Sequence, residues 1–138
     1  MKVLMIEPEK TAYVAEIGDS RKDIQQVVGE MIEVVYPYEE RVALVCNDEG
    51  KIDGMPLNRG LRDKDGNIYD IIAGTFFICG LSEDNFASLT QEQIEKYDKE
   101  FHDPEVFIRT KDKIIAFKVS ERDRDTQNKS HEQRGHDR

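Results

Sequence analysis

The residues of this sequence that could take part in covalent or metal chemistry are few and far apart. Cys46 and Cys79 each lie inside an apolar run, which is typical of buried, reduced thiols in a cytosolic protein. No neighbouring residue suggests a base that would activate either thiol, and their spacing is not that of a zinc motif. His102 is the only histidine outside the C-terminal segment. We therefore predict no catalytic residue, no metal site and no cofactor, and a protein that is not an enzyme.

Residues 63–67 place side-chain oxygens at alternate positions, as the first half of a calcium-binding loop does. The next position, which requires glycine for the sharp turn, holds Ile68. The position that requires a bidentate glutamate holds Gly74. These two mismatches favour a polar hairpin turn over a calcium site.

The segment 54–60, bracketed by glycines, has the composition of a loop that could bind a ligand. Its adjacent Asn58 and Arg59 offer an amide and a guanidinium, which together suit a phosphate or a carboxylate. The following hairpin would bring Tyr69 and Asp70 close to this pair. The alternative is that Asn58 bonds to the local backbone and Arg59 pairs with an acid of the protein. The candidate ligand-binding residues are thus Asn58, Arg59, Tyr69 and Asp70.

Local patterns predict the elements that must position these residues. Residues 2–7 and 13–17 are apolar or alternating runs, and they predict an antiparallel hairpin. Asp19 or Ser20 caps a predicted helix that ends at Gly29. Two β-branched runs, 31–36 and 42–46, predict the next strands.

The second half of the chain continues with turns and hairpins. Residues 47–50 have the composition of a tight hairpin turn with Gly50 in the left-handed position. The most apolar run, 71–79, predicts a central strand, with Gly74 marking a bend or a turn into it. A capping box at Thr90 begins an amphipathic helix that ends before Pro104. Two runs, 106–109 and 114–119, predict a last hairpin.

Composition divides the chain of 138 residues into two parts. Residues 120–138 contain no aliphatic, aromatic or cysteine residue, so they cannot bury enough apolar surface to offset the entropy of ordering. We predict a disordered polar tail there and a single α+β domain at 1–119. The predicted fold is a mostly antiparallel sheet of hairpins with two short helices packed on it.

The net charge of -9 belongs to the predicted domain, because 24 of the 29 acidic residues but only 15 of the 20 basic residues fall in 1–119. Such a surface repels nucleic-acid phosphates, so we predict no direct binding of nucleic acid. No apolar run approaches the length of about 18 residues that spans a membrane, so we predict a cytoplasmic protein without a membrane partner.

Four ordered motifs resemble a bacterial family of domains of unknown function that is met in phages, plasmids and conjugative elements of Gram-positive bacteria. They are VGEMIE (28–33), CNDEGK (46–51), PLNR (56–59) and DIIAGTFFI (70–78). The resemblance covers residues 2–101, and the charged segment from Ser120 on departs from it. It implies no activity, although the Asn58-Arg59 pair belongs to one of its motifs.

These observations predict a non-enzymatic accessory protein of a mobile genetic element that binds a host defence or regulatory protein. The acidic domain suits this role, because its negative charge steers encounters with a basic surface. The alternative prediction is the binding of a small anionic ligand or a nucleotide at Asn58 and Arg59.

Overall fold

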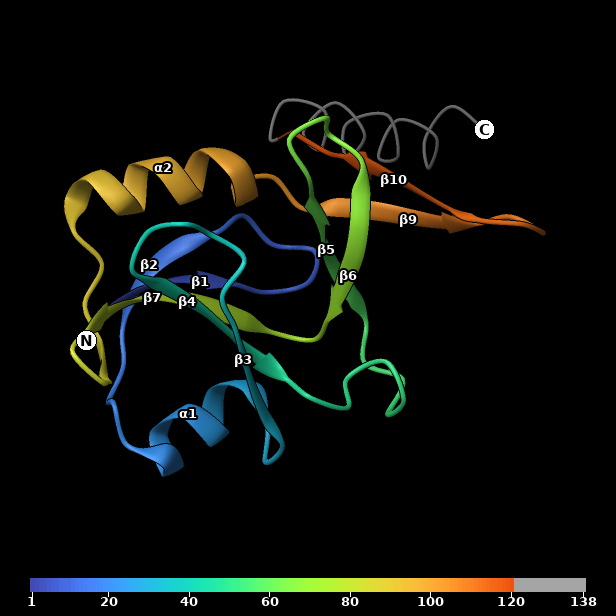
Figure 1. Cartoon of the computed structure of the whole chain (residues 1–138). Coiled ribbons are helices and arrows are strands. Elements are labelled where there is room, and N and C mark those ends of the chain that lie inside the picture. The colour runs from blue at the N-terminus through green and yellow to red at the C-terminus, as the bar shows by residue number, and fades with distance from the viewer. Residues whose placement is uncertain (121–138) are drawn as a thin grey trace, which may run out of the picture.

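The structure is a computed structural model that describes residues 1–120. The described part contains ten strands and two helices (Figure 1). Along the chain these are β1 (Lys2–Ile6), β2 (Tyr13–Glu16), α1 (Arg21–Val28), β3 (Ile32–Val35), β4 (Val42–Asn47), β5 (Leu57–Arg62), β6 (Ile68–Ala73), β7 (Phe76–Ser82), β8 (Asn85–Ala87), α2 (Gln91–Phe101), β9 (Glu105–Arg109) and β10 (Ile114–Lys118). The predicted disordered tail, 120–138, lies outside the described residues from position 121 on.

Six strands form one antiparallel sheet in the order β2-β1-β7-β4-β3, with β8 also paired to β7. β7 lies between β1 and β4, so that Ile78 is paired with Leu4 on one side and with Leu44 on the other. A strand with partners on both edges satisfies its backbone groups inside the sheet, and β7 is buried from Phe76 to Gly80. The predicted central strand is therefore confirmed for this part of the apolar run.

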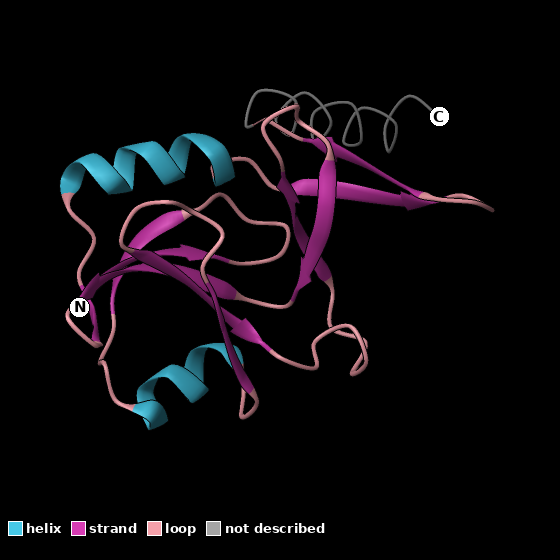
Figure 2. Cartoon of the chain, viewed as in Figure 1, coloured by secondary structure: helices cyan, strands magenta, loops and turns pink. Residues whose placement is uncertain are grey.

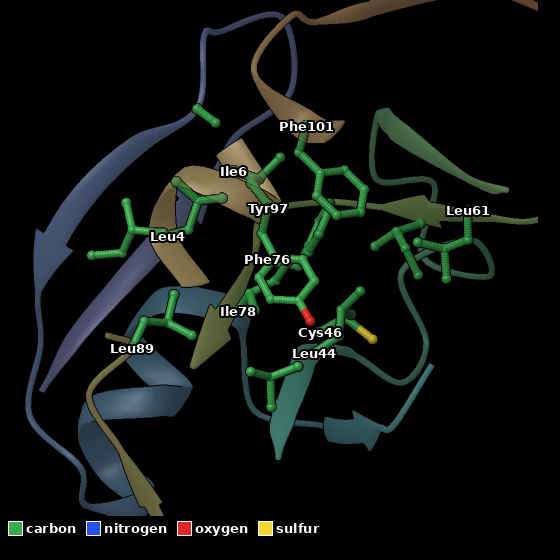
Figure 3. Packing of buried hydrophobic residues seen from close by; sticks show 14 residues of the cluster. Leu4, Ile6, Leu44, Cys46, Leu61, Phe76, Ile78, Leu89, Tyr97 and Phe101 are labelled. Atoms are coloured by element: carbon green, nitrogen blue, oxygen red, sulfur yellow. The ribbon is translucent and has the colours of Figure 1, made fainter. Parts of the chain in front are cut away.

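The two helices cover opposite faces of the sheet, which is where the core lies (Figure 2). Alternation along β7 turns Ile78 toward α2 and Phe77 toward α1. On the α2 face, the ring centroids of Phe76 and Phe101 lie 5.7 Å apart in an edge-to-face arrangement (Figure 3). The prediction of an α+β fold with a mostly antiparallel sheet and two helices is confirmed.

Both helices begin at the capping residues that the sequence predicts. The Ser20 hydroxyl accepts a hydrogen bond from the Asp23 backbone N–H at 3.1 Å, and α1 ends at Gly29, whose φ is +107°. At α2, the Thr90 hydroxyl accepts from the Gln93 N–H at 3.1 Å, while the Gln93 side chain accepts from the Thr90 N–H at 2.9 Å. In the described part of the chain, no helix has the length and apolar character needed to cross a membrane.

Two further hairpins, β5–β6 and β9–β10, lie outside the six-stranded sheet and together at one end of the molecule (Figure 1). The predicted polar turn at 63–67 joins β5 to β6, where the Asp63 carboxylate accepts from the backbone N–H groups of Asp65 and Asn67. The predicted last hairpin is β9–β10, which pairs antiparallel over its whole length. All four candidate site residues lie in the β5–β6 hairpin.

The prediction of a hairpin turn at 47–50 is wrong. β4 pairs with β3 and β7 and does not form a hairpin with β5, and Gly50 is not among the glycines with positive φ. Glycine is required there for a different reason, because a Cβ on Gly50 would lie 2.7 Å from the carbonyl oxygen of Ala73. The apolar run 71–79 is interrupted at Gly74, whose φ of +80° forms the turn from β6 into β7.

The capping box of α2 gives a prediction about stability. Thr90→Ala removes the side-chain acceptor of the Gln93 N–H and should lower the free energy of unfolding by about 1 kcal/mol. Thr90→Ser keeps the hydroxyl and should stay close to the wild type. Urea unfolding followed by circular dichroism measures both, and an equal loss in the two variants would contradict the assignment of the cap.

Candidate functional site

Asn58 and Arg59 lie in strand β5 and not in a loop, which corrects the sequence prediction. The exposed fraction is 0 % for Asn58 and 1 % for Arg59. The pairing of β5 with β6 shifts register between Leu57 and Arg59, so Asn58 stands at an irregularity of the strand. The expected presentation of this pair to an anion in solvent is therefore not found.

The amide of Asn58 connects the central sheet to the β5–β6 hairpin. Its Nδ2 donates to the carbonyl oxygens of Ile6 and Gly74, each at 2.9 Å. Its Oδ1 accepts from Nη1 of Arg59 at 2.8 Å. The two carbonyls belong to the end of β1 and to the turn after β6, so the side chain satisfies backbone groups at the points where regular pairing stops.

The guanidinium of Arg59 connects β5 to two further segments. Nε donates to the carbonyl oxygen of Phe101 at 3.1 Å, at the end of α2, and Nη2 donates to that of Lys10 at 2.7 Å, between β1 and β2. Nη1 also lies 3.3 Å from the carbonyl oxygen of Asn58. The donors of Arg59 thus point to the protein's own backbone, and this arrangement is structural.

A third buried polar residue, Glu105 at the start of β9, joins the two peripheral hairpins, and sequence reasoning missed it. Its Oε2 accepts from the Gly60 backbone N–H at 2.9 Å, and its Oε1 lies 2.5 Å from Nη2 of Arg62. The side chain of Glu105 is almost fully buried. The one signal in the sequence is an acid between Pro104 and an apolar strand, where a solvated residue was equally consistent.

Tyr69 and Asp70 lie apart from the buried pair, on the wall of a cavity of about 570 Å³. The structure brings them to Lys51 and Arg109, two cations that the sequence analysis did not select. Lys51 Nζ lies 2.7 Å from the Asp70 carboxylate. The remaining wall is mainly apolar and consists of Gly54, Met55, Leu57, Ile68, Ile71 and Ile114. Two of the four predicted site residues therefore share a cavity, and the other two support the fold.

A second cavity, of about 230 Å³, adjoins the first and shares Lys51 and Asp70 with it. Its wall also carries Glu33, Cys46 and Asp48. Desolvation, followed by the neighbouring Asp48 carboxylate, raises the pKa of Glu33 above its ordinary value. This cavity is acidic, in contrast to the larger one.

The two thiols are buried, as the sequence predicts, and they lie on opposite faces of the sheet. Burial raises the pKa of Cys46 to about 12, helped by Glu33, whose Oε1 lies 3.7 Å from the sulfur. Burial alone raises the pKa of Cys79 to about 12. At neutral pH both sulfurs are therefore protonated and poor nucleophiles. Among residues 1–120, no cluster of three or more His, Cys, Asp or Glu side chains could hold a metal ion.

Comparison with protein families decides the family of the chain. The model of a domain of unknown function, DUF3846, matches residues 1–102, which is more than half of the 138 residues. The chain belongs to the DUF3846 family. No curated protein and no solved structure matches it. The expected membership of a family of unknown function is confirmed.

The DUF3846 match places the candidate residues in two groups. Lys51, Asn58, Arg59, Tyr69 and Asp70 lie inside the matched range. The hairpin β9–β10, which supplies a cation and an apolar residue to the larger cavity, lies beyond it. The cavity is thus built partly from the DUF3846 region and partly from the segment that follows.

The structural role of Arg59 gives a second prediction. Arg59→Met keeps much of the side-chain volume but leaves the carbonyl groups of Phe101 and Lys10 without these donors, each at a cost of about 1–3 kcal/mol. The free energy of unfolding should therefore fall by about 3 kcal/mol or more. Arg41→Met makes the same change at an exposed position and should alter stability by less than about 0.5 kcal/mol. Urea unfolding compares the two variants, and similar losses would refute the buried network.

The Glu33 carboxylate gives a third prediction, about pH. Because the pKa of Glu33 is raised in the folded state, protonation favours folding below the ordinary value of 4.5, and this contribution is lost as the pH rises through the folded pKa. Glu33→Gln should therefore stabilise the protein at pH 7 by a few tenths of a kcal/mol, since the group is largely exposed. The gain should disappear in acid, below the pKa of Glu33.

Thermal unfolding of Glu33→Gln at neutral and acidic pH measures this difference. Glu39→Gln, an exposed residue with the same change of charge, is the control. A gain at neutral pH that is equal in both variants would assign the effect to net charge instead of to the neighbouring Asp48.

Proposed function

We propose that this DUF3846 protein is a non-enzymatic accessory protein of a mobile genetic element that acts in the cytoplasm by binding a host protein. The observation that carries the proposal is the apolar outer face of the β9–β10 hairpin. Val106 and Phe117 are directly paired across its two strands, and their exposed fractions are 50 % and 51 %. Apolar side chains that are exposed to solvent on a hairpin outside the main sheet are typical of a protein-binding surface.

Period-two alternation separates the two faces of this hairpin. The pair Ile108 and Ile115 follows Val106 and Phe117 on the outer face, so all four side chains there are apolar. Arg109 and its cross-strand partner Ile114 lie on the opposite face, toward the larger cavity. The outer face can therefore enter an apolar contact without the desolvation of a charge.

The negative charge of the protein supports the proposal of a partner with a basic surface. Residues 1–119 carry an excess of nine acidic over basic residues, which attracts a positively charged surface over a distance of about 8–10 Å at ordinary salt concentrations. This field speeds encounter, and the apolar face then holds the partner. We propose a host protein that presents basic residues around an apolar patch.

Two further observations support a role without catalysis and within a mobile element. The thiols Cys46 and Cys79, the strongest nucleophiles of residues 1–120, are both buried, and burial raises their pKa values to about 12. The four sequence motifs resemble a family met in phages, plasmids and conjugative elements. A DUF3846 protein from such an element would meet the proteins of its host in the cytoplasm.

The outer face gives the fourth prediction, tested by affinity capture from a Gram-positive host lysate with the full chain as bait. The double variant Val106→Ser/Phe117→Ser should lose at least about nine tenths of the captured partner, since contacts of this type contribute about 1–3 kcal/mol together. Ile52→Ser removes another exposed aliphatic side chain, far from this face in the sequence, and should capture the partner as the wild type does.

Salt provides the second arm of this test. Capture by the wild type should weaken strongly between low and high salt concentrations, because the steering charges are screened. A partner held equally by the double variant and by Ile52→Ser, or held without dependence on salt, would refute the proposed surface. Circular dichroism of each bait shows whether a loss reflects the contact or unfolding.

A further inference from the structure

We infer that the larger cavity binds a small molecule that has one anionic group on an apolar or aromatic body. This site is separate from the proposed protein-binding face, because it lies on the other side of the β9–β10 hairpin. It also differs from the predicted site at Asn58 and Arg59, whose side chains are buried. The inference rests on the size of the cavity, its apolar wall and the placement of its charges.

The size and the wall of the cavity suit a small organic molecule. Its volume of about 570 Å³ falls within the range of about 300–1,000 Å³ that is usual for ligand sites. The apolar side chains come from three separate segments: Met55 and Leu57 before or in β5, Ile68 and Ile71 in β6, and Ile114 in β10. A wall assembled from three segments offers a concave surface that a single exposed strand does not.

The charges of the cavity favour an anion. Lys51 and Arg109 contribute two positive charges, while Asp70 contributes one negative charge that is already paired with Lys51 at 2.7 Å. Within residues 1–120, the guanidinium of Arg109 makes no hydrogen bond and no ion pair. An exposed guanidinium in this position can bind a carboxylate or a phosphate through two parallel hydrogen bonds.

The orientation of the ligand follows from the neighbouring acidic cavity. Glu33 and Asp48 lie beyond Lys51 and Asp70, so an anionic group would be repelled from that side. The anionic group therefore lies at Arg109, and the apolar body extends along β6 toward Met55 and Leu57. The ring of Tyr69, more than half exposed, is available to stack on a planar body at the opening.

Four probes test the ligand class by isothermal titration calorimetry with the full chain. AMP and indole-3-acetate combine an anionic group with a planar body, whereas adenosine lacks the charge and inorganic phosphate lacks the body. We expect AMP or indole-3-acetate to bind with a dissociation constant below about 1 mM, and adenosine and phosphate to bind at least about tenfold more weakly. Binding of AMP alone assigns a phosphate ligand, and binding of indole-3-acetate alone assigns a carboxylate ligand.

Substitutions in the cavity test where the probe binds. Arg109→Met should weaken the binding of the preferred probe by about tenfold or more, the loss of one charge-assisted contact. Arg41→Met makes the same change away from the cavity and should leave the affinity unchanged. Asp70→Asn should strengthen binding by about threefold, because Lys51 is released from its carboxylate partner.

The inference is wrong if neither AMP nor indole-3-acetate binds with a dissociation constant below about 1 mM. It is also wrong if Arg109→Met and Arg41→Met have the same affinity. The double variant Val106→Ser/Phe117→Ser changes only the outer face of the hairpin and should bind the probe normally. If the probe binds but no partner is captured, only the proposed function is wrong. If a partner is captured but no probe binds, only the inference about this site is wrong.

Discussion

The hydrogen bonds of Asn58 and Arg59 hold the peripheral part of the molecule to its central sheet. The two side chains donate to backbone carbonyls of four separate segments, at Ile6, Lys10, Gly74 and Phe101. Ile6 and Phe101 are the last residues of β1 and α2, Gly74 follows β6, and Lys10 lies between β1 and β2, so these carbonyls are at the ends of the regular elements or outside them. A buried guanidinium is costly unless its donors are bonded, and these carbonyls supply the acceptors. The same contacts fix the position of β5, which contributes Leu57 to the wall of the larger cavity.

This polar attachment also bears on the place of the larger cavity, which lies between the two peripheral hairpins. Inside the central sheet, β7 contacts strands on both edges and helices on both faces, so side chains fill the space between the layers. The two peripheral hairpins share no ladder of backbone bonds, and Glu105 joins them through the Gly60 N–H and the Arg62 guanidinium. Because only side chains join the two hairpins, the space between them is not closed by backbone pairing. The larger cavity lies there, and residues of β6, β9 and β10 contribute to its wall.

Most predictions that depend on neighbouring residues are confirmed, with the turn at 47–50 as the exception, whereas the surroundings of the candidate site depend on distant residues and are missed. The capping box at Thr90 and the turn at 63–67 are satisfied within four residues, and both predictions are confirmed. The sequence predicts a loop for Asn58 and Arg59, because glycines bracket the segment 54–60. Their decisive partners lie 52 and 42 residues away, at Ile6 and Phe101. The sequence predicts that Tyr69 and Asp70 lie close to that pair, whereas in the structure they share a cavity wall with Arg109.

The β9–β10 hairpin takes part in both proposed activities, protein binding and ligand binding, through its two opposite faces. Alternation along its strands places Val106 and Phe117 on one face and Arg109 and Ile114 on the other, so one element can contact a protein and line a ligand cavity. This hairpin follows the residues that match DUF3846, which end at His102. Lys51, Tyr69 and Asp70 therefore lie inside the matched range, whereas Arg109, whose guanidinium makes the cavity suitable for an anion, lies outside it. The proposed ligand binding requires Arg109, which lies beyond the matched range, so membership of the DUF3846 family does not by itself imply it.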